Sequence, residues 1–513
     1  MSSDAEFSKW RAFFWPVHHH ELKKLVPMLL IFFFLFFDYN VLRCMKETLV
    51  ITAKGSGAEV IPFIKVWVMF PSSVLLTWVF IRLCNRFDRE KVFYIMLSLF
   101  LGFFSLFAFV LYPMGDQVHL HNLANNLATV LPEGCKGLVS MIRYWSFTIF
   151  YAMAELWGNI ILFVLVWGFA NQMTKLEEAK RFYGLFGVGI NFSGIAAGQL
   201  SIIAARLSEG ASSQVDPNSW GQALGYLITM TVGAALIALA LFAWLNKTLK
   251  NHPELTADSV SSTKKAKVKL SMRENIRYLL SSRYMLYLVA IVISYNIIIN
   301  LTEILWKHEA KELYPNPTAY NIFMSKVTMW TGILATLGSL LVSGNCLRLF
   351  GWTATAMITP AILLITSIGF FSFFFLKGSP EITASLAGVS PLMLVVFFGT
   401  VQNCCSRAAK YTVFDATKEM VFIPLTQAEK IKGKAAVDGI CNRMGKSGGS
   451  VIFQFLLIMF SSITASAPYV AVILFSIIAI WIVAIRNLGV QFAQRTQPMT
   501  HPEEVAEVAV SAT

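Results

Sequence analysis

The stretch MLLIFFFLFF (Met28 to Phe37) consists only of apolar side chains, and FYIMLSLFLGFFSLFAFVLY (Phe93 to Tyr112) has almost no polar ones. A helix rises about 1.5 Å per residue, so about 20 apolar residues cross the hydrocarbon core of a bilayer. Segments this long and apolar are typical of membrane-spanning helices rather than of strands in a soluble core. The bilayer is therefore expected to decide the fold.

The composition of the whole chain agrees with these segments. Of its 513 residues, 56% are hydrophobic and only 14% are charged, which is more apolar surface than one soluble core can bury. The formal net charge of +13 does not indicate nucleic-acid binding. A DNA or RNA binder gathers Lys and Arg on a solvated face with base-reading elements, whereas here they follow the positive-inside pattern of short loops. No nucleic-acid partner is expected.

The cysteines and histidines give no sign of a metal or a cofactor. Seven cysteines are an odd number, and they have no disulfide or zinc spacing. The run His18 to His20 precedes the first apolar segment beside Lys23 and Lys24, so we interpret it as a solvated cluster. The polar first 24 residues show no cleavable signal or plastid transit peptide. We therefore expect a retained first helix and a bacterial chain.

Apolar runs bounded by charges, Pro or Gly predict twelve helices. They lie near residues 25–52, 62–84, 91–113, 138–170, 183–206, 221–248, 284–306, 318–347, 352–376, 387–413, 434–462 and 466–489. The longest polar interruption, Asn251 to Met272, separates six helices from six. The predicted fold is an all-α polytopic membrane protein with a major-facilitator-like bundle of two halves around a central cavity.

The domain plan and the orientation follow from this division. We expect a cytoplasmic N-terminal segment (1–24), two six-helix halves (25–248 and 284–489), a cytoplasmic linker (249–283) and a cytoplasmic tail (490–513). Basic loops such as the one holding Arg82, Arg86 and Arg89 would face the cytoplasm. The predicted location is the bacterial inner membrane, with both termini inside the cell.

Polar side chains inside four of these helices gather on one face each, as expected for about 3.6 residues per turn. The stripes are Asn40, Arg43, Lys46 and Glu47 on the first helix; Tyr151, Glu155 and Asn159 on the fourth, extended backward by Phe147 and Arg143; Asn296, Asn300, Glu303 and Lys307 on the seventh; and Asp438, Asn442, Lys446 and Ser450, with Arg443 adjoining, on the eleventh. A charge at the bilayer centre costs about 2.5–3.5 kcal/mol on insertion scales. Each therefore needs a partner, a water-filled cavity or a function.

Two interpretations of these stripes remain open. In the first, Lys46 pairs with an acid on its own or a neighbouring helix, Glu303 pairs with Lys307, and the pairs only lock the bundle. In the second, the stripes line one cavity for an anion. Lys46, Lys446, Arg43 and Arg443 would then neutralise phosphates.

The second interpretation gives the other polar residues roles around the same cavity. Glu155 and Glu303 would keep the cations from closing salt bridges without substrate, and Asn159 and Asn442 would complete the site. Tyr151 or Phe147 could stack on a base, although packing is the more common role for one aromatic side chain. The segment GICNRMGKS (Gly439 to Ser447) is not a Walker A loop, because five residues separate its glycines and no strand precedes it. We expect no enzyme.

At these residues the chain resembles the ATP/ADP translocases of plastids and obligate intracellular bacteria. The similar segments are LRCMKETLVITAKGSGAEVIPFIKVW (Leu42 to Trp67), SRAAKYTVFDATKEMVFIPL (Ser406 to Leu425) and KGKAAVDGICNRMGKSGGS (Lys432 to Ser450). Some family members have Leu-Arg-Asp-Thr-Lys-Asp where this chain has Leu42 to Glu47, so a role for an acid at position 44 is lost here.

The resemblance implies an antiporter that takes up host ATP and returns ADP, with phosphate as a further solute on the ADP side. Its important charges map onto Lys46, Glu155, Glu303 and Lys446. The alternatives are a proton-coupled importer of several nucleotides, in which Glu155, Glu303 or Asp38 titrates, and a facilitator for another organic anion. We expect function as a monomer in the lipid bilayer. A receptor would need a soluble domain, and the polar segments are too short for one.

Overall fold

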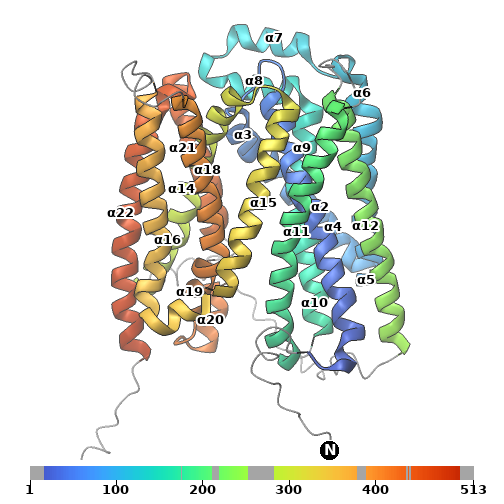
Figure 1. Cartoon of the computed structure of the whole chain (residues 1–513), viewed down its shortest axis with the longest axis vertical. Helices are drawn as coiled ribbons and strands as arrows, with labels where there is room; N and C mark the ends of the chain where they lie inside the picture. The colour runs from blue at the N-terminus through green and yellow to red at the C-terminus, as the bar shows by residue number, and fades with distance from the viewer. Residues whose placement is uncertain are drawn as a thin grey trace, which may run out of the picture.

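The structure is a computed structural model that describes residues 17–174, 176–210, 219–251, 282–341, 343–377, 389–434, 437 and 441–496. Every regular element in these ranges is a helix, and most run roughly parallel to one direction (Figure 1). Most of the predicted linker and tail, as well as Asp438, lies outside the described residues. The all-α polytopic fold predicted from the sequence is confirmed.

The first half of the chain contains six long helical segments. They are α2 (Leu22–Thr52); α3 (Val60–Phe63), a π-helical turn (Ile64–Val68) and α4 (Met69–Arg86); α5 (Arg89–Leu106), a π-helical turn (Phe107–Leu111) and α6 (Tyr112–Met114); α9 (Trp145–Trp157), a π-helical segment (Gly158–Val166) and α10 (Trp167–Met173); α11 (Leu176–Gly210); and α12 (Ser219–Asn251). Two shorter helices, α7 (His121–Val130) and α8 (Lys136–Arg143), cover one end of the bundle (Figure 1).

The second half has six segments as well. They are α14 (Arg283–Leu313); α15 (Pro317–Leu341); α16 (Ser343–Leu376); α18 (Pro391–Ala409), a π-helical turn (Lys410–Phe414) and α19 (Asp415–Met420); α21 (Asn442–Phe460); and α22 (Ile463–Thr496). A short helix, α20 (Gln427–Lys434), precedes α21. Ten helical segments among the described residues are long and apolar enough to cross a bilayer. With α15 and α21, which pack alongside them, all twelve predicted helices have a counterpart.

The structure differs from the predicted helix boundaries in two places. The helix predicted over 138–170 breaks at Tyr144, whose φ of −103° and ψ of 52° are not helical. Arg143 therefore ends α8, where it donates a hydrogen bond to Asn125 (2.9 Å), away from the Glu155 stripe. The eighth helix, α15, ends at Leu341 rather than near 347. Gly351, with φ 72°, then kinks α16 just before the predicted start at 352, a conformation that favours glycine.

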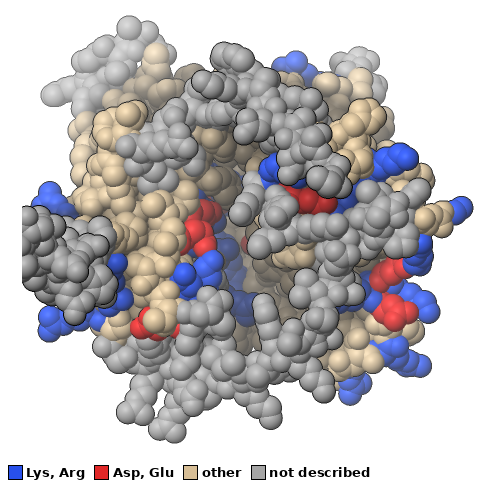
Figure 2. All heavy atoms as spheres, turned by 90° about the horizontal axis from the view of Figure 1, so that it is seen from below, with Lys and Arg blue, Asp and Glu red and all other residues tan. Residues whose placement is uncertain are grey.

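The buried apolar side chains form two separate cores. One core contains only residues of the first half, between Val17 and Leu249. The other is built mainly from the second half, but it includes Val50 from the end of α2 and Ile61 from α3. The halves are therefore joined by apolar packing at the end of the bundle that α7 and α8 cover. Seen from the opposite end, where α2 begins, the molecule is hollowed near its centre, and basic and acidic side chains line the hollow (Figure 2).

Contacts between the halves follow a reciprocal pattern. The fifth segment of the first half, α11, packs on the second segment of the second half, α15. In return, α3 and the π-helical turn after it pack on α21, the fifth segment of the second half. Glycine permits the close approach of α11 and α15, because a Cβ on Gly332 would lie 2.9 Å from the carbonyl oxygen of Asn191. The pairing is that of two repeats related by a pseudo-twofold axis.

Candidate functional site

The first element of the site is an ion pair between α2 and α9. The Lys46 ammonium pairs with the Glu155 carboxylate and lies 4.4 Å from the centroid of the Tyr151 ring. The Lys46 side chain is 5% exposed, but that of Glu155 is 34% exposed. One turn of α9 separates Tyr151 from Glu155, as the predicted stripe requires. The pair is therefore open on its carboxylate side and closed on its ammonium side.

The second element is a buried cluster around Glu303 on α14. Glu303 Oε1 accepts from Lys307 Nζ at 2.8 Å and from Arg407 Nη2, on α18, at 2.9 Å. Lys307 Nζ also lies 2.8 Å from Glu47 Oε1 on α2, and both of those side chains are below 5% exposed. Lys65 adds a third cation, 4.0 Å from Glu303 and bonded to Asn300 Oδ1. These contacts tie the two halves together through charge.

Lys446 on α21 is the third element, and it is exposed. Its backbone carbonyl accepts a hydrogen bond from Asn300 Nδ2 at 3.0 Å. Gly445 and Gly449 let α21 approach α14, since a Cβ on each would lie 2.8 and 2.9 Å from the Cβ atoms of Asn296 and Asn300. No residue in the described part of the chain forms an ion pair with Lys446, although its charge interacts with those of Glu155 and Lys46.

Positive charge predominates in this group. Arg43 and Lys410 belong to it through their interactions with Glu303 and Lys446. The cations are Arg43, Lys46, Lys65, Lys307, Arg407, Lys410 and Lys446, against the carboxylates Glu47, Glu155 and Glu303. Unpaired cations in a partly desolvated site attract an anion with several oxygens, because each oxygen can accept a charge-assisted hydrogen bond.

The structure brings together some of the predicted site residues and not others. Lys46, Glu155, Tyr151 and Glu303 make the contacts described above, and Arg43 is half-buried beside them. Asn442 is half-buried, whereas Asn159 and Arg443 are exposed. Within the described residues, no hydrogen bond or ion pair joins any of these three to the charge cluster. Their roles stay predictions.

Two expectations about the charges need correction. Glu155 does not keep Lys46 from closing a salt bridge, because the two residues pair directly. Glu303 closes on Lys307 and Arg407 rather than standing between the predicted phosphate-binding lysines. The ion pairs that the first interpretation expects are thus present at Lys46 and Glu303, and the choice between locking and binding stays a prediction. The first interpretation does not account for Lys446, which has no such partner in the described ranges.

The predicted base stacking by Tyr151 or Phe147 also needs correction. Tyr151 is 1% exposed beneath Lys46, and Phe147 stacks on Tyr144 and Tyr112. Neither ring is free to stack on a base in this conformation. Tyr411 is 53% exposed instead, and it lies close enough to Arg43 and Lys446 for electrostatic interaction.

The functional residues missed by sequence reasoning lie on the second and tenth helices. Lys65 stands in the apolar run IPFIKVW, and Arg407, Lys410 and Tyr411 stand in SRAAKYTVF. A charge inside an apolar helix was the available signal, as it was for Lys46. Lys65, Lys410 and Tyr411 lie in π-helical turns, which are frequent at functional sites but have no sequence pattern. The tenth helix, α18, therefore joins the first, fourth, seventh and eleventh around the site.

Solved structures share the fold at low sequence identity. A bacterial homologue of the iron transporter ferroportin, in an inward-facing state, matches with a TM-score of 0.53 and 12% identity, over 93% of this chain and 98% of that one. A D-xylose-proton symporter matches with a TM-score of 0.51 and 14% identity, over 85% and 90%. With ten helices among the described residues that are long and apolar enough to cross a membrane, the chain has the fold of a multi-pass membrane protein of major-facilitator-like architecture.

Sequence relatives specify the family. The model of the TLC ATP/ADP transporter family matches residues 1–492. The ADP,ATP carrier protein 1 of Chlamydia pneumoniae is 43% identical over 508 residues, covering 99% of this chain and 98% of the relative. The chloroplastic ADP,ATP carrier protein 1 of Arabidopsis thaliana is 39% identical over 92% of this chain and 74% of its own. The chain belongs to the TLC ATP/ADP transporter family.

Proposed function

We propose that this protein is an antiporter that exchanges external ATP for internal ADP by alternating access. The observation that carries the proposal is the surplus of cations over carboxylates on helices of both halves, in a chain of this family. A polyphosphate chain supplies the oxygens and the negative charge that such a surplus binds. A neutral sugar would leave the positive charges uncompensated. Exchange breaks no covalent bond, so no enzymatic step is needed.

The nucleotide would lie between the halves with its phosphates on Lys446, Lys46 and Arg43. Lys446 is available without breaking a pair, and the exposed side of Glu155 allows phosphate to compete for Lys46. The base would stack on Tyr411, which is exposed in the neighbourhood of Lys446 and Arg43. Such stacking contributes about 1–3 kcal/mol per base in nucleic-acid binding proteins. The remaining polar side chains of the proposed site, which would contact the nucleotide once it is bound, are Asn159, Asn442 and Arg443.

Strict exchange would arise from the charge cluster itself. Reversing the open end requires the bond between Glu47 on α2 and Lys307 on α14 to break or rearrange, since it joins the halves. Breaking a buried pair is expensive, so an empty carrier would reorient slowly. Bound nucleotide would lower that barrier by supplying new partners for the cations. Phosphate accompanying the ADP would use the same cations, and one chain would suffice as the functional unit.

We place the protein in the inner membrane of a bacterium, with both termini in the cytoplasm. The end at which α2 begins also carries Arg82, Arg86, Arg89 and Lys250, as expected for a cytoplasmic face. The hollow in Figure 2 would then open to the cytoplasm. We retain the division into halves 25–248 and 284–489 joined by the linker 249–283, and the two separate cores support it.

Counterflow in proteoliposomes tests the function. Vesicles loaded with ADP are expected to take up labelled ATP, while empty vesicles are not. Lys446→Ala should reduce uptake more than tenfold, because it removes a proposed phosphate ligand that no ion pair among the described residues engages. Lys247→Ala, which removes an exposed lysine of α12, is the matched control and should transport normally. Undiminished uptake by Lys446→Ala would refute the site.

A second candidate, a proton-coupled importer of several nucleotides, is favoured by Asp38. Its side chain is fully buried in α2, and neither carboxyl oxygen has a hydrogen-bond partner among the described residues. Intramembrane carboxyl groups of this kind serve as proton relays in some transporters. Uptake of ATP into empty vesicles at the full rate when a proton gradient is imposed would favour this candidate over exchange.

A further inference from the structure

We propose that a cavity in the first half, away from the central charges, is a binding site for one anionic phospholipid. The cavity of about 750 Å³ lies between α4, α5, α10 and α12, together with the π-helical segment before α10. None of the central charged residues lines it. Its wall residues approach the ends of α4, α5, α10 and α12, at the end of the molecule where α2 begins (Figure 1). The inference is independent of the transported solute.

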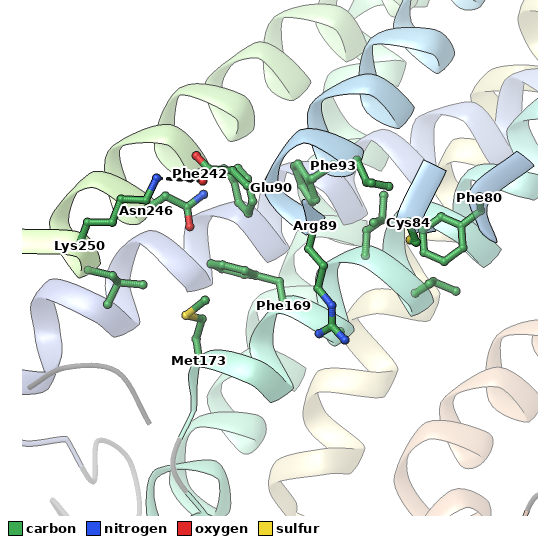
Figure 3. Close-up of a pocket in the computed structure, with 15 residues that line it drawn as sticks. Phe80, Cys84, Arg89, Glu90, Phe93, Phe169, Met173, Phe242, Asn246 and Lys250 are labelled. Atoms are coloured by element: carbon green, nitrogen blue, oxygen red, sulfur yellow. Dashed lines mark hydrogen bonds and ion pairs between the residues drawn. The ribbon is translucent and has the colours of Figure 1, made fainter. Parts of the chain in front are cut away.

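The walls of the cavity match a hydrocarbon chain. Phe80, Phe93, Phe169 and Phe242 line it, and Figure 3 shows Phe93, Phe169 and Phe242 around one space. The rings of Phe93 and Phe242 stack at 4.1 Å, and Phe169 meets Phe242 edge-on at 4.9 Å. Gly168 adds no side chain, and a Cβ at that position would have no atom within 4 Å. The aromatic walls can therefore take an acyl chain without rearrangement.

The mouth of the cavity matches a phosphodiester. Lys250 on α12 and Arg89 on α5 bring two positive charges, and Glu90 Oε2 lies 3.1 Å from Lys250 Nζ. The described residues that line this end of the cavity thus include two cations and one carboxylate, and this modest positive charge suits the single charge of a lipid phosphodiester better than a nucleotide polyphosphate. Basic pockets between membrane helices at the cytoplasmic side are known to hold anionic lipid headgroups.

Asn246 supplies an independent indication of a ligand. Its side chain is 8% exposed and lines the cavity one turn before Lys250. Its Nδ2 atom has no hydrogen-bond acceptor among the described residues, although a buried donor without a partner costs about 1–3 kcal/mol. Figure 3 shows Asn246 and Lys250 on the same side of the space. An ester carbonyl of a lipid, lying between its phosphate and its acyl chain, would accept this hydrogen bond.

The exposed side of α4 places the cavity within reach of the bilayer. Phe70, Leu75 and Trp78 on α4, and Trp67 in the π-helical turn before it, are each at least 50% exposed. These side chains require lipid around them, so a chain entering between α4 and α5 comes directly from the membrane. The geometry favours lipid over a soluble anion as the occupant.

Native mass spectrometry of the full-length protein tests the proposal. The delipidated protein in detergent is incubated with phosphatidylglycerol or phosphatidylcholine and then washed. We expect one phosphatidylglycerol to be retained per chain and phosphatidylcholine to be lost. Gly168→Leu, which would fill the cavity from a position with free space, should reduce this retention at least fivefold. Gly102→Leu, at an exposed glycine of α5 that also has free space, is the matched control and should bind like the parent protein.

A second variant keeps the test decisive if Gly168→Leu folds poorly. Asn246→Leu keeps the size of the side chain and removes the donor, so lipid retention should fall while the melting temperature in lipid-free detergent stays equal or rises. Arg82→Gln, which removes an exposed charge on α4 outside the cavity, should leave retention unchanged. Equal retention of both lipids, parental retention by Asn246→Leu, or competition of ATP with the bound lipid would overturn the proposal.

Discussion

The two carboxylate-centred groups of the central site use the same kinds of residues in opposite ways. Glu155 has one cation, Lys46, and a third of its side chain is exposed. Glu303 has three cations around it and is 12% exposed, and its neighbour Lys307 binds Glu47 on the other half. We propose that the first arrangement, the binding group, can exchange its partner for a ligand, whereas the second, the locking group, holds the halves in place. On this proposal, burial and number of partners, rather than residue type, separate the two groups.

The largest effect is expected from removing the central cation of the locking group. Lys307→Ala leaves Glu47 and Glu303 without a shared buried partner, and breaking such a pair costs about 3–5 kcal/mol. We expect a sharp drop in melting temperature and in the yield of folded protein, measured by fluorescence-detected size exclusion during heating. The triple variant Glu47→Gln, Glu303→Gln, Lys307→Met should recover much of this stability. An unchanged melting temperature for Lys307→Ala would remove the distinction between the two groups.

A smaller effect on stability and a large one on transport are expected at the binding group. Glu155→Gln leaves the buried ammonium of Lys46 without its carboxylate, but the Glu155 side is 34% exposed and Lys46 still lies over the Tyr151 ring. The melting temperature should therefore fall, but by less than in Lys307→Ala. Nucleotide exchange should fall at least tenfold, because Lys46 would hold phosphate without a competing carboxylate to release it. Counterflow rates together with binding of labelled ADP check this. Weaker rather than tighter ADP binding would contradict the proposed competition.

A moderate effect is expected at Tyr411. Tyr411→Ala should raise the KM for ATP by about five- to a hundredfold, which corresponds to the loss of about 1–3 kcal/mol of base stacking. Tyr411→Phe keeps the ring and should transport like the parent protein. Uptake at varied ATP concentration separates the two variants. Equal losses in both would indicate that the hydroxyl, and not the ring, is needed.

The smallest effect is expected at Asp38, which belongs to neither group. An unpaired charge at this buried position would cost several kcal/mol. Asp38→Asn cannot ionise and therefore avoids this cost. We expect the variant to exchange ATP and ADP within about twofold of the parent rate, the usual range for near-neutral substitutions. Exchange measured with and without a proton gradient checks this. Loss of uptake in the variant would favour the proton-coupled candidate.

Helix number, fold class and the first and fourth polar stripes were predictable because helical periodicity acts locally. Tyr151 and Glu155 share a face of α9 for a reason visible in the spacing of that helix alone, and Lys46 lies on the polar stripe predicted for α2. The pairing of Lys65 and Arg407 with Glu303 was not predictable, because it depends on how the second, seventh and tenth helices, from both halves, meet. The break at Tyr144 and the π-helical turns at Lys65 and Lys410 also change which face each helix presents, and neither has a sequence signature.

The unequal composition of the two apolar cores bears on how the chain is assembled during synthesis. Among the described residues, the first core contains none beyond Leu249, so we expect it to form as soon as the first six segments have left the ribosome. The second core includes Val50 and Ile61 of the first half, so its packing is incomplete until these residues are in place. We therefore expect the second half of the chain to acquire its native packing only when the first half is already folded.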